Sequence, residues 1–237
     1  MKILKYLTIA VIPLIVSGCF MVGGSERLGS VDHYIGEYLI IQDAPELIIT
    51  AEDVIKTDFK NTFTHINYSL DRKPRDQFAA EMGDVDFTKI TGIKGVERLN
   101  SMPDLYSMYP IITHINIYSD AMWDEKHEAG ESLDDCFSLT YYSFAPYIDS
   151  RYKKSMQNSM NEPITKSLSQ LEEMDLRLVN YTSGRLGAVE DDKDLIWFAI
   201  TSPTTNPEPQ VLTFEWTMHT GEVYTGEIEY APSQMSF

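Results

Sequence analysis

The chain has 237 residues, of which 36 are acidic and 19 are basic, so its net charge at neutral pH is −17. Phosphate backbones and anionic lipid headgroups repel such a chain, which argues against nucleic-acid binding and against membrane adhesion by charge. The length is sufficient for the core of one large domain or of two small ones.

The first 18 residues have the pattern of an export signal. Two lysines precede an uncharged stretch over residues 6–16, and the small residues Ser17 and Gly18 follow. A positive start, an apolar stretch and a small-residue cleavage site are the parts of a signal peptide. The apolar stretch contains Pro13 and has about half of the ~20 residues that a membrane-spanning helix needs. The sequence therefore predicts export.

The four residues Val16-Ser17-Gly18-Cys19 are similar to the lipobox of bacterial lipoproteins. In that family a peptidase cuts before the cysteine, whose sulfur then carries a diacylglycerol. The resemblance implies that residues 1–18 form a lipoprotein signal peptide and that Cys19 is the lipidation site. One acyl chain, such as palmitate, is a marginal anchor, whereas several chains hold a protein on a membrane almost permanently. The alternative is an ordinary signal peptide that leaves Cys19 as a plain thiol.

The resemblance also bears on location and on the rest of the chain. Phe20 follows the cysteine where an aspartate favours inner-membrane retention in some bacteria, so the outer membrane is the expected part of the cell envelope. Loss of residues 1–18, which hold two lysines and no acid, would leave 17 basic and 36 acidic side chains, a net charge of −19. Residues 19–30 contain glycine and serine without periodicity and predict a flexible tether. Residues 31–237 would form one extracytoplasmic β-rich domain.

Short apolar or alternating segments predict strands along this domain. They are residues 38–41, 63–70, 111–119, 136–143, 174–180 and 194–201. In the third of them, Ile111, Thr113, Ile115 and Ile117 should share one face of a sheet.

The end of the chain has the clearest pattern. Apolar residues alternate with polar ones over 212–218, a polar break follows at 219–222, and the alternation returns over 224–230. This is the pattern of a β-hairpin with one buried and one solvated face. Its first strand should bury Leu212, Phe214, Trp216 and Met218.

Two segments have helical signals. Residues 74–83 run from a proline to a glycine stop, and apolar residues recur three apart over 165–174. Many short strands with a few short helices predict a mainly β fold, a β-sandwich-like single domain. An α+β fold is the alternative.

The sequence contains neither the G-x-S-x-G nucleophile motif nor the H-E-x-x-H zinc motif. Its richest polar segment, residues 119–135, carries seven acidic side chains, whose oxygens could bind calcium. The spacing of an EF-hand loop is missing, however, so we interpret this segment as a solvated loop and expect neither a metal site nor a cofactor. Paired carboxylates could also serve a hydrolase, but a chain with 36 acids brings some pair together in almost any fold.

Three aromatic residues are candidates for a ligand-binding surface. Trp123 stands among acids in the expected loop, and of the adjacent Tyr141 and Tyr142 one must face outward if both lie in a strand. Incidental exposure is the alternative. Trp197 and Trp216 should be core residues, and Cys136 should pack as a small apolar side chain.

A second resemblance covers more of the chain. Residues 115–137, taken with the predicted hairpin over 214–230, resemble uncharacterised bacterial lipoprotein families that have a domain of unknown function. That resemblance implies no activity and no site residue. The sequence thus predicts a membrane-anchored domain without catalytic function that binds a glycan or an envelope protein. An envelope hydrolase using paired carboxylates and a structural subunit of a surface assembly are the alternatives.

Overall fold

The computed structural model describes residues 32–50, 54–59, 62–66, 72–93, 105–181 and 196–232. The signal peptide, Cys19 and the tether that the sequence predicts lie outside these residues. Within them, strands outnumber helices and form three sheets, so the predicted mainly β fold with a few short helices is confirmed. In the same ranges, every helix is too short or too polar to cross a lipid bilayer.

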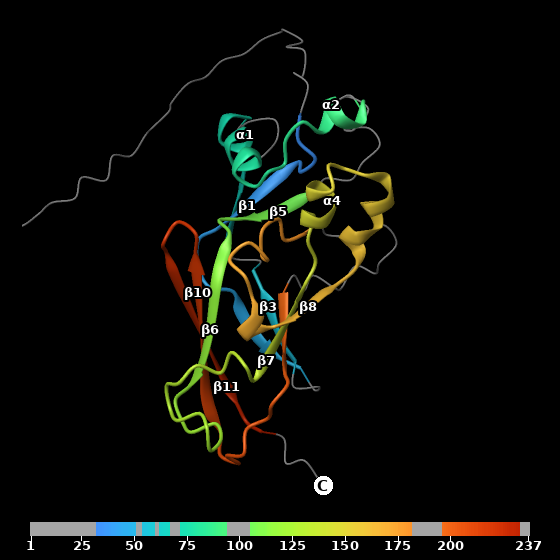
Figure 1. Ribbon diagram of the computed structural model, residues 1–237. Coiled ribbons are helices and arrows are strands. Elements are labelled where there is room, and N and C mark those ends of the chain that lie inside the picture. Colours follow the sequence, from blue (N-terminus) through green and yellow to red (C-terminus); the bar gives the residue numbers. More distant parts are fainter. Residues whose placement is uncertain are drawn as a thin grey trace, which may run out of the picture.

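Each sheet contains strands that are distant in the sequence (Figure 1). The first sheet has the order β2 (Glu46–Ile49), β3 (Val54–Asp58), β9 (Ile196–Ile200), β7 (Phe137–Tyr141) and β8 (Ile164–Ser167). The second has the order β11 (Val223–Tyr230), β10 (Gln210–Met218) and β6 (Ile112–Ser119). The third has the order β4 (Phe63–Ile66), β1 (Glu37–Ile41) and β5 (Tyr106–Tyr109). Paired neighbours are antiparallel except β1 and β5, which are parallel.

The hairpin predicted at the end of the chain is present as β10 and β11. The two strands pair without interruption from Gln210 and Tyr230 to Thr217 and Val223. Gly221 has a φ of 93° in the connecting turn, a conformation that glycine adopts without strain. The predicted inward residues of β10 are all buried: Leu212, Phe214, Trp216 and Met218.

The start of β6 departs from the predicted alternation. Thr217 pairs with His114 and Met218 pairs with Ile112, which leaves Thr113 as an extra residue on β6. Such a bulge reverses the facing of the side chains beyond it. Ile112 is therefore buried and Thr113 only partly so, and the expectation that Thr113 shares the face of the buried isoleucines is wrong.

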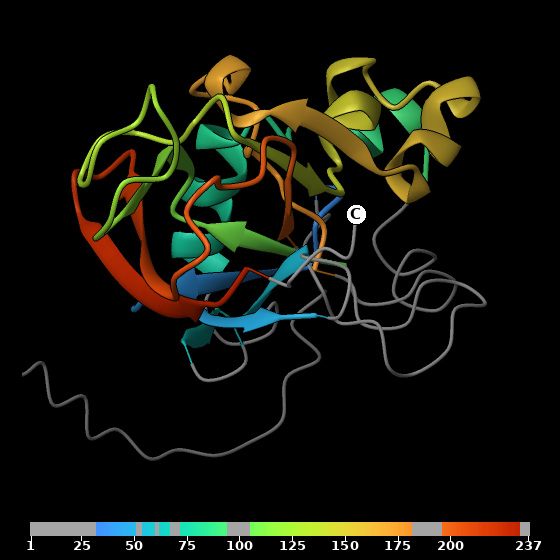
Figure 2. The same ribbon diagram turned by 90° about the horizontal axis from the view of Figure 1, so that it is seen from below.

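The first and second sheets face each other and enclose the main core (Figure 2). Phe198 of β9 lies 5.1 Å from Phe214 and 5.6 Å from Trp216, both on β10, between ring centroids. Phe137 of β7 lies 6.3 Å from Phe214. Burial of these aromatic rings contributes most to core stability, since each ring removes a large apolar area from water.

The helices gather at the other end of the molecule, around β1 and β5 (Figure 1). They are α1 (Arg72–Glu81), α2 (Phe87–Thr91), α4 (Ala145–Asp149) and the 3₁₀ helix η1 (Lys154–Asn161). They cover a second core that includes Tyr34, Phe87, Tyr147 and Tyr152. The two cores adjoin along β5, because Met108 belongs to the first and Leu105, just before β5, to the second.

A buried carboxylate holds this helical end together. Asp84 accepts hydrogen bonds from the backbone N–H groups of Tyr34 and Ile35, both at 2.7 Å, and from the Tyr152 hydroxyl at 2.8 Å. These partners come from two separate parts of the chain, so Asp84 connects three segments. Burial raises the pKa of Asp84, and the three hydrogen bonds oppose that rise.

The helical predictions have mixed outcomes. The helix expected over 74–83 is present as α1 and is followed by Gly83 at a φ of 76°. The helix expected over 165–174 is wrong, because β8 and the short 3₁₀ helix η2 (Leu168–Gln170) occupy most of that segment. The strand expected over 174–180 is reduced to isolated bridges at Val179 and Asn180.

Candidate functional site

A long loop, residues 120–136, connects β6 to β7 at the end of the molecule opposite the helices (Figure 1). Three of its side chains, Trp123, Leu133 and Cys136, are buried in the main core. The Trp123 indole N–H donates to the Ser202 carbonyl at 3.0 Å, and the Leu133 N–H donates to the Ile117 carbonyl at 2.7 Å. The loop is therefore fixed at two points, and its polar residues have defined positions.

The aromatic candidates of the sequence do not form a surface. Trp123 is 0% exposed, and its ring packs 5.9 Å from Phe137 and 5.6 Å from Tyr230, so the expectation of a ligand-facing indole is wrong. The acids beside Trp123 in the sequence are polar, but the indole turns inward between the two sheets. Its burial follows from strands that lie far away in the chain.

The two tyrosines divide as the alternation of a strand requires. Tyr141 is 2% exposed, so it is a core residue and not the ligand-facing candidate that we expected. Tyr142 is partly buried, and its ring lies 5.7 Å from Trp197. Trp197 is likewise only partly buried, whereas a core position was expected. Trp123 contacts Phe137 at the start of β7. Tyr141 lies four residues further along the same strand, about 13 Å from Phe137, so Trp123 and Tyr141 are not brought together.

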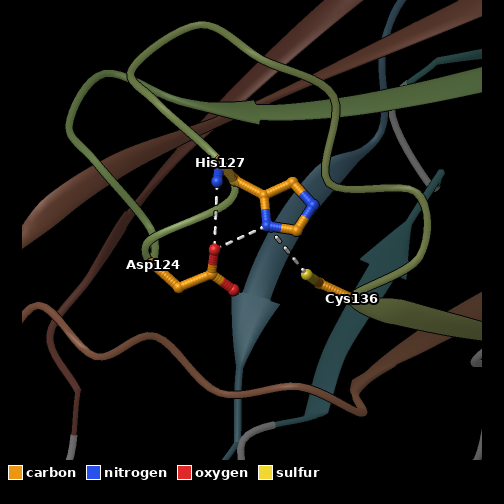
Figure 3. Close-up of side chains that lie close together, drawn as sticks. All are labelled: Asp124, His127 and Cys136. Carbon is orange, nitrogen blue, oxygen red and sulfur yellow. Dashed lines mark hydrogen bonds and ion pairs between the residues drawn. The ribbon is translucent and has the colours of Figure 1, made fainter.

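The structure brings together three other side chains of the loop: Asp124, His127 and Cys136 (Figure 3). His127 Nδ1 lies 2.8 Å from Asp124 Oδ1 and 3.9 Å from Cys136 Sγ. One potential ligand atom from each residue lies within 4.8 Å of the other two. Among the residues that the structure describes, this is the only group of three or more His, Cys, Asp or Glu side chains so arranged.

Local backbone geometry explains the position of Asp124. Its Oδ1 accepts the N–H groups of Lys126 at 2.8 Å and of His127 at 3.0 Å. Aspartate commonly closes a turn in this way. The same oxygen then accepts from the His127 ring, so the turn itself sets the imidazole beside the carboxylate.

Asp135 holds the other side of the imidazole. Its Oδ1 lies 3.0 Å from His127 Nε2 and 3.6 Å from Cys136 Sγ. His127 therefore lies between two carboxylates, one on each ring nitrogen. Burial of His127 opposes its protonation, but the hydrogen bonds and charges of Asp124 and Asp135 outweigh that effect and raise its pKa.

Cys136 is a buried thiol in acidic surroundings. It is 1% exposed and belongs to the main core, as the sequence predicts. Burial, followed by the negative charges of Asp135 and Asp124, raises the pKa of the thiol to about 11. Reactive cysteines occur in the opposite setting, where positive groups lower the pKa.

The remaining acids of the loop do not gather around a common point. Glu125, Glu128 and Glu131 are exposed, and Glu131 accepts the N–H of Glu128 at 2.7 Å. Asp120 accepts the N–H of Val211 at 2.8 Å. Glu131 closes a turn, Asp120 bonds to the backbone of β10, and all four carboxylates are exposed, which agrees with the interpretation of 119–135 as a solvated loop.

Sequence reasoning missed His127 because the residue belongs to no recognised zinc motif. One signal was available: Asp124 and His127 are three residues apart, a spacing that a tight turn can bring together, and Cys136, one of two cysteines in the chain, follows nine residues after His127. Comparisons of the chain with protein families, with curated proteins and with solved structures find no match. The proposed function therefore rests on the sequence and on the geometry of the site.

Proposed function

We propose that the chain is a membrane-anchored extracytoplasmic lipoprotein whose domain binds a ligand or partner and does not catalyse a reaction. The lipobox-like residues Val16-Ser17-Gly18-Cys19 and the positive start support the anchor. The outer membrane of the cell envelope is the location that Phe20 favours. The net charge of −17 disfavours nucleic acid as a partner, which leaves a glycan or an envelope protein among macromolecules.

The environment of Cys136 favours a binding function over a catalytic one. A nucleophilic cysteine needs a base that takes its proton and a setting that stabilises the thiolate. Here the sulfur is buried, its pKa is raised to about 11, and the nearest ring nitrogen of His127 lies 1.1 Å closer to Asp124 Oδ1 than to the sulfur. Two carboxylates and an imidazole around a protonated thiol form a set of ligands, not an activated nucleophile.

The anchor is tested by the mass of the mature chain. Protein expressed in a bacterium should be found in the membrane fraction, cleaved before Cys19 and carrying diacylglycerol and further acyl chains on that residue. The Cys19→Ala chain should remain uncleaved and unmodified. A freely secreted wild-type chain without lipid would overturn the anchor.

The absence of catalysis is tested at the thiol. Native Cys136 should react with iodoacetamide at pH 7.5 at least about 100-fold more slowly than the same residue in the unfolded chain, because the thiolate fraction is small and the sulfur is buried. Modification at Cys136 is read from its peptide by mass spectrometry. Fast native modification, together with a hydrolytic activity that Cys136→Ser abolishes, would contradict the proposal.

A further inference from the structure

We propose that Asp124, His127 and Cys136 form a binding site for a divalent transition metal of the zinc class. The inference rests on the proposed binding function, because it names a ligand class for the same loop. No metal motif in the sequence points to it, since the H-E-x-x-H zinc motif and the EF-hand spacing are both missing. It follows from the side-chain positions alone.

The distances between the donor atoms match those around a small metal ion. Zinc binds cysteine sulfur at about 2.3 Å and histidine nitrogen or carboxylate oxygen at about 2.0–2.2 Å, in tetrahedral geometry, so neighbouring donors lie roughly 3.3–3.6 Å apart. His127 Nδ1 is 2.8 Å from Asp124 Oδ1 and 3.9 Å from Cys136 Sγ, on either side of that value. Side-chain shifts of about half an ångström reconcile these two distances with zinc geometry, and the third pair, Asp124 and Cys136, has its donor atoms within 4.8 Å.

Asp135 sets the imidazole in the state that a metal requires. A metal-bound histidine usually donates its other ring N–H to a carboxylate, which fixes the tautomer. Asp135 Oδ1 lies 3.0 Å from His127 Nε2, so it accepts that N–H, and an ion that binds Nδ1 takes the place of the proton shared there with Asp124. Nδ1 is the ring atom that faces both Asp124 and Cys136 (Figure 3).

The backbone holds the three ligands before any ion arrives. The N–H of Cys136 donates to the Leu133 carbonyl at 2.8 Å, and its own carbonyl accepts the N–H of Thr201 at 2.8 Å. Asp124 is fixed by the turn it closes. The His127 and Asp124 side chains are 13% and 17% exposed, so an ion can enter from solvent and keep a water molecule as its fourth ligand.

The donor types favour zinc over calcium and magnesium. Thiolate and imidazole are ligands of zinc and of neighbouring transition metals, whereas calcium needs six to eight oxygen atoms. The cluster offers one sulfur, one nitrogen and one carboxylate, and the other loop acids named above point elsewhere. Hard cations should therefore compete poorly.

The test uses the full-length chain in detergent with Cys19→Ser, which removes the second sulfur, after treatment with a chelator. Zinc alone is titrated in competition with a chromophoric chelator, and the bound metal is counted after gel filtration. One equivalent should bind with a Kd below about 1 μM, and a hundredfold excess of Ca²⁺ or Mg²⁺ should not displace it. Cobalt(II) should produce the near-ultraviolet absorption of a cobalt–thiolate bond, which Cys136→Ser abolishes.

Three variants and one control assign the residues of the site. His127→Gln should weaken zinc binding at least about 100-fold. Asp124→Asn keeps the turn-closing oxygen but loses the charge, and it should also weaken binding, while Asp135→Asn should cost about 10- to 100-fold as an outer partner does. The control is His114→Gln, an exposed histidine on β6, which should leave the Kd unchanged.

Three results would overturn the inference: no zinc bound at micromolar concentration, equal losses in His127→Gln and His114→Gln, or displacement by calcium. A shift of no more than about 4 °C in the thermal unfolding of Asp124→Asn and His127→Gln without metal separates lost ligands from lost fold. Lipidation of Cys19 and the slow alkylation of Cys136 are separate readouts. Failure to bind zinc would therefore leave the proposed function standing, and failure of the anchor would leave the metal site standing.

Discussion

The two ends of the molecule each contain a cluster of polar side chains, and the clusters differ in how their atoms are used. At the helical end, both oxygens of Asp84 accept hydrogen bonds from buried N–H and hydroxyl groups, and the residue is 0% exposed. At the loop end, Asp124, Cys136 and Asp135 converge on one imidazole, and all but the sulfur reach solvent.

This difference separates a structural cluster from a candidate binding site. Asp84 connects the backbone N–H groups of Tyr34 and Ile35 with the hydroxyl of the distant Tyr152, so its hydrogen bonds stabilise the fold. His127 and its neighbours bind mainly one another, and their donor atoms could turn toward a ligand at little cost to the fold. If that distinction is right, substitutions at the helical end should lower stability more than substitutions in the loop cluster.

The largest effect is expected from Asp84→Ala. The substitution leaves the buried N–H groups of Tyr34 and Ile35 without acceptors, and each unsatisfied group costs about 1–3 kcal/mol. The free energy of unfolding in urea should fall by about 3–5 kcal/mol. The exposed acid Glu162 is the control, since Glu162→Ala should change it by less than about 0.5 kcal/mol. If Asp84→Ala lowered the free energy of unfolding by less than about 1 kcal/mol, Asp84 would not be the structural cluster that distinguishes the helical end from the loop end.

A smaller effect is expected from Tyr152→Phe. The phenylalanine keeps the ring contacts with Phe87 and Tyr147 but loses the hydroxyl that Asp84 and the Val85 carbonyl accept from. A hydrogen bond to a charged group contributes about 1.5–3 kcal/mol, so unfolding should become easier by about 2 kcal/mol. In the control Tyr118→Phe, the lost hydroxyl belongs to a partly exposed residue and lies 3.4 Å from Glu215. Equal losses of stability in the two variants would contradict the claim that the hydrogen bonds of Asp84 stabilise the fold more than a surface contact does.

His127→Gln should change the stability of the metal-free chain by only about 1 kcal/mol. The ring is partly exposed and its partners are solvated carboxylates, so little buried bonding is lost. Urea unfolding in the presence of a chelator measures this change. A destabilisation as large as that of Asp84→Ala would mean that the loop cluster is a structural element like the helical one.

The smallest effect concerns pH at the helical end. Burial of Asp76 opposes its ionisation, but Arg75 at 2.7 Å and His33 at 3.2 Å outweigh it and hold the pKa of Asp76 below its usual value. Because the folded-state pKa is the lower one, this carboxylate stabilises the fold above about pH 4 and loses that effect as the pH falls further. Asp76→Asn should flatten the decline of stability below pH 4, as followed by urea unfolding. An unchanged slope would count against this account of the pair.

Periodicity in the sequence predicted the parts of the fold that depend on local pattern. The alternation over 212–218 predicts a strand because every second residue is buried, and β10 has that arrangement. The short strands β2 and β3 alternate in burial, but their residue types do not alternate between apolar and polar: Ile48 of β2 is 44% exposed, and β3 contains lysine and aspartate. Their strand conformation comes from pairing with each other and with β9, which is distant in sequence.

The candidate site could be predicted only in part for the same reason. The sequence located the acidic loop and the inward packing of Cys136, because composition and strand pattern are local signals. It placed Trp123 on the surface, because its neighbours are acids, whereas the indole packs against Phe137 and the distant Tyr230. That packing also brings His127 to Cys136, nine residues away, and no local pattern encodes it.

The most direct test of the loop cluster is anomalous X-ray scattering at the zinc absorption edge from crystals of the chain grown with zinc. The account predicts a single strong peak about 2.0–2.3 Å from Asp124 Oδ, His127 Nδ1 and Cys136 Sγ, with Asp135 still bonded to Nε2. A peak coordinated only by exposed carboxylates, or no peak between these three atoms, would contradict it.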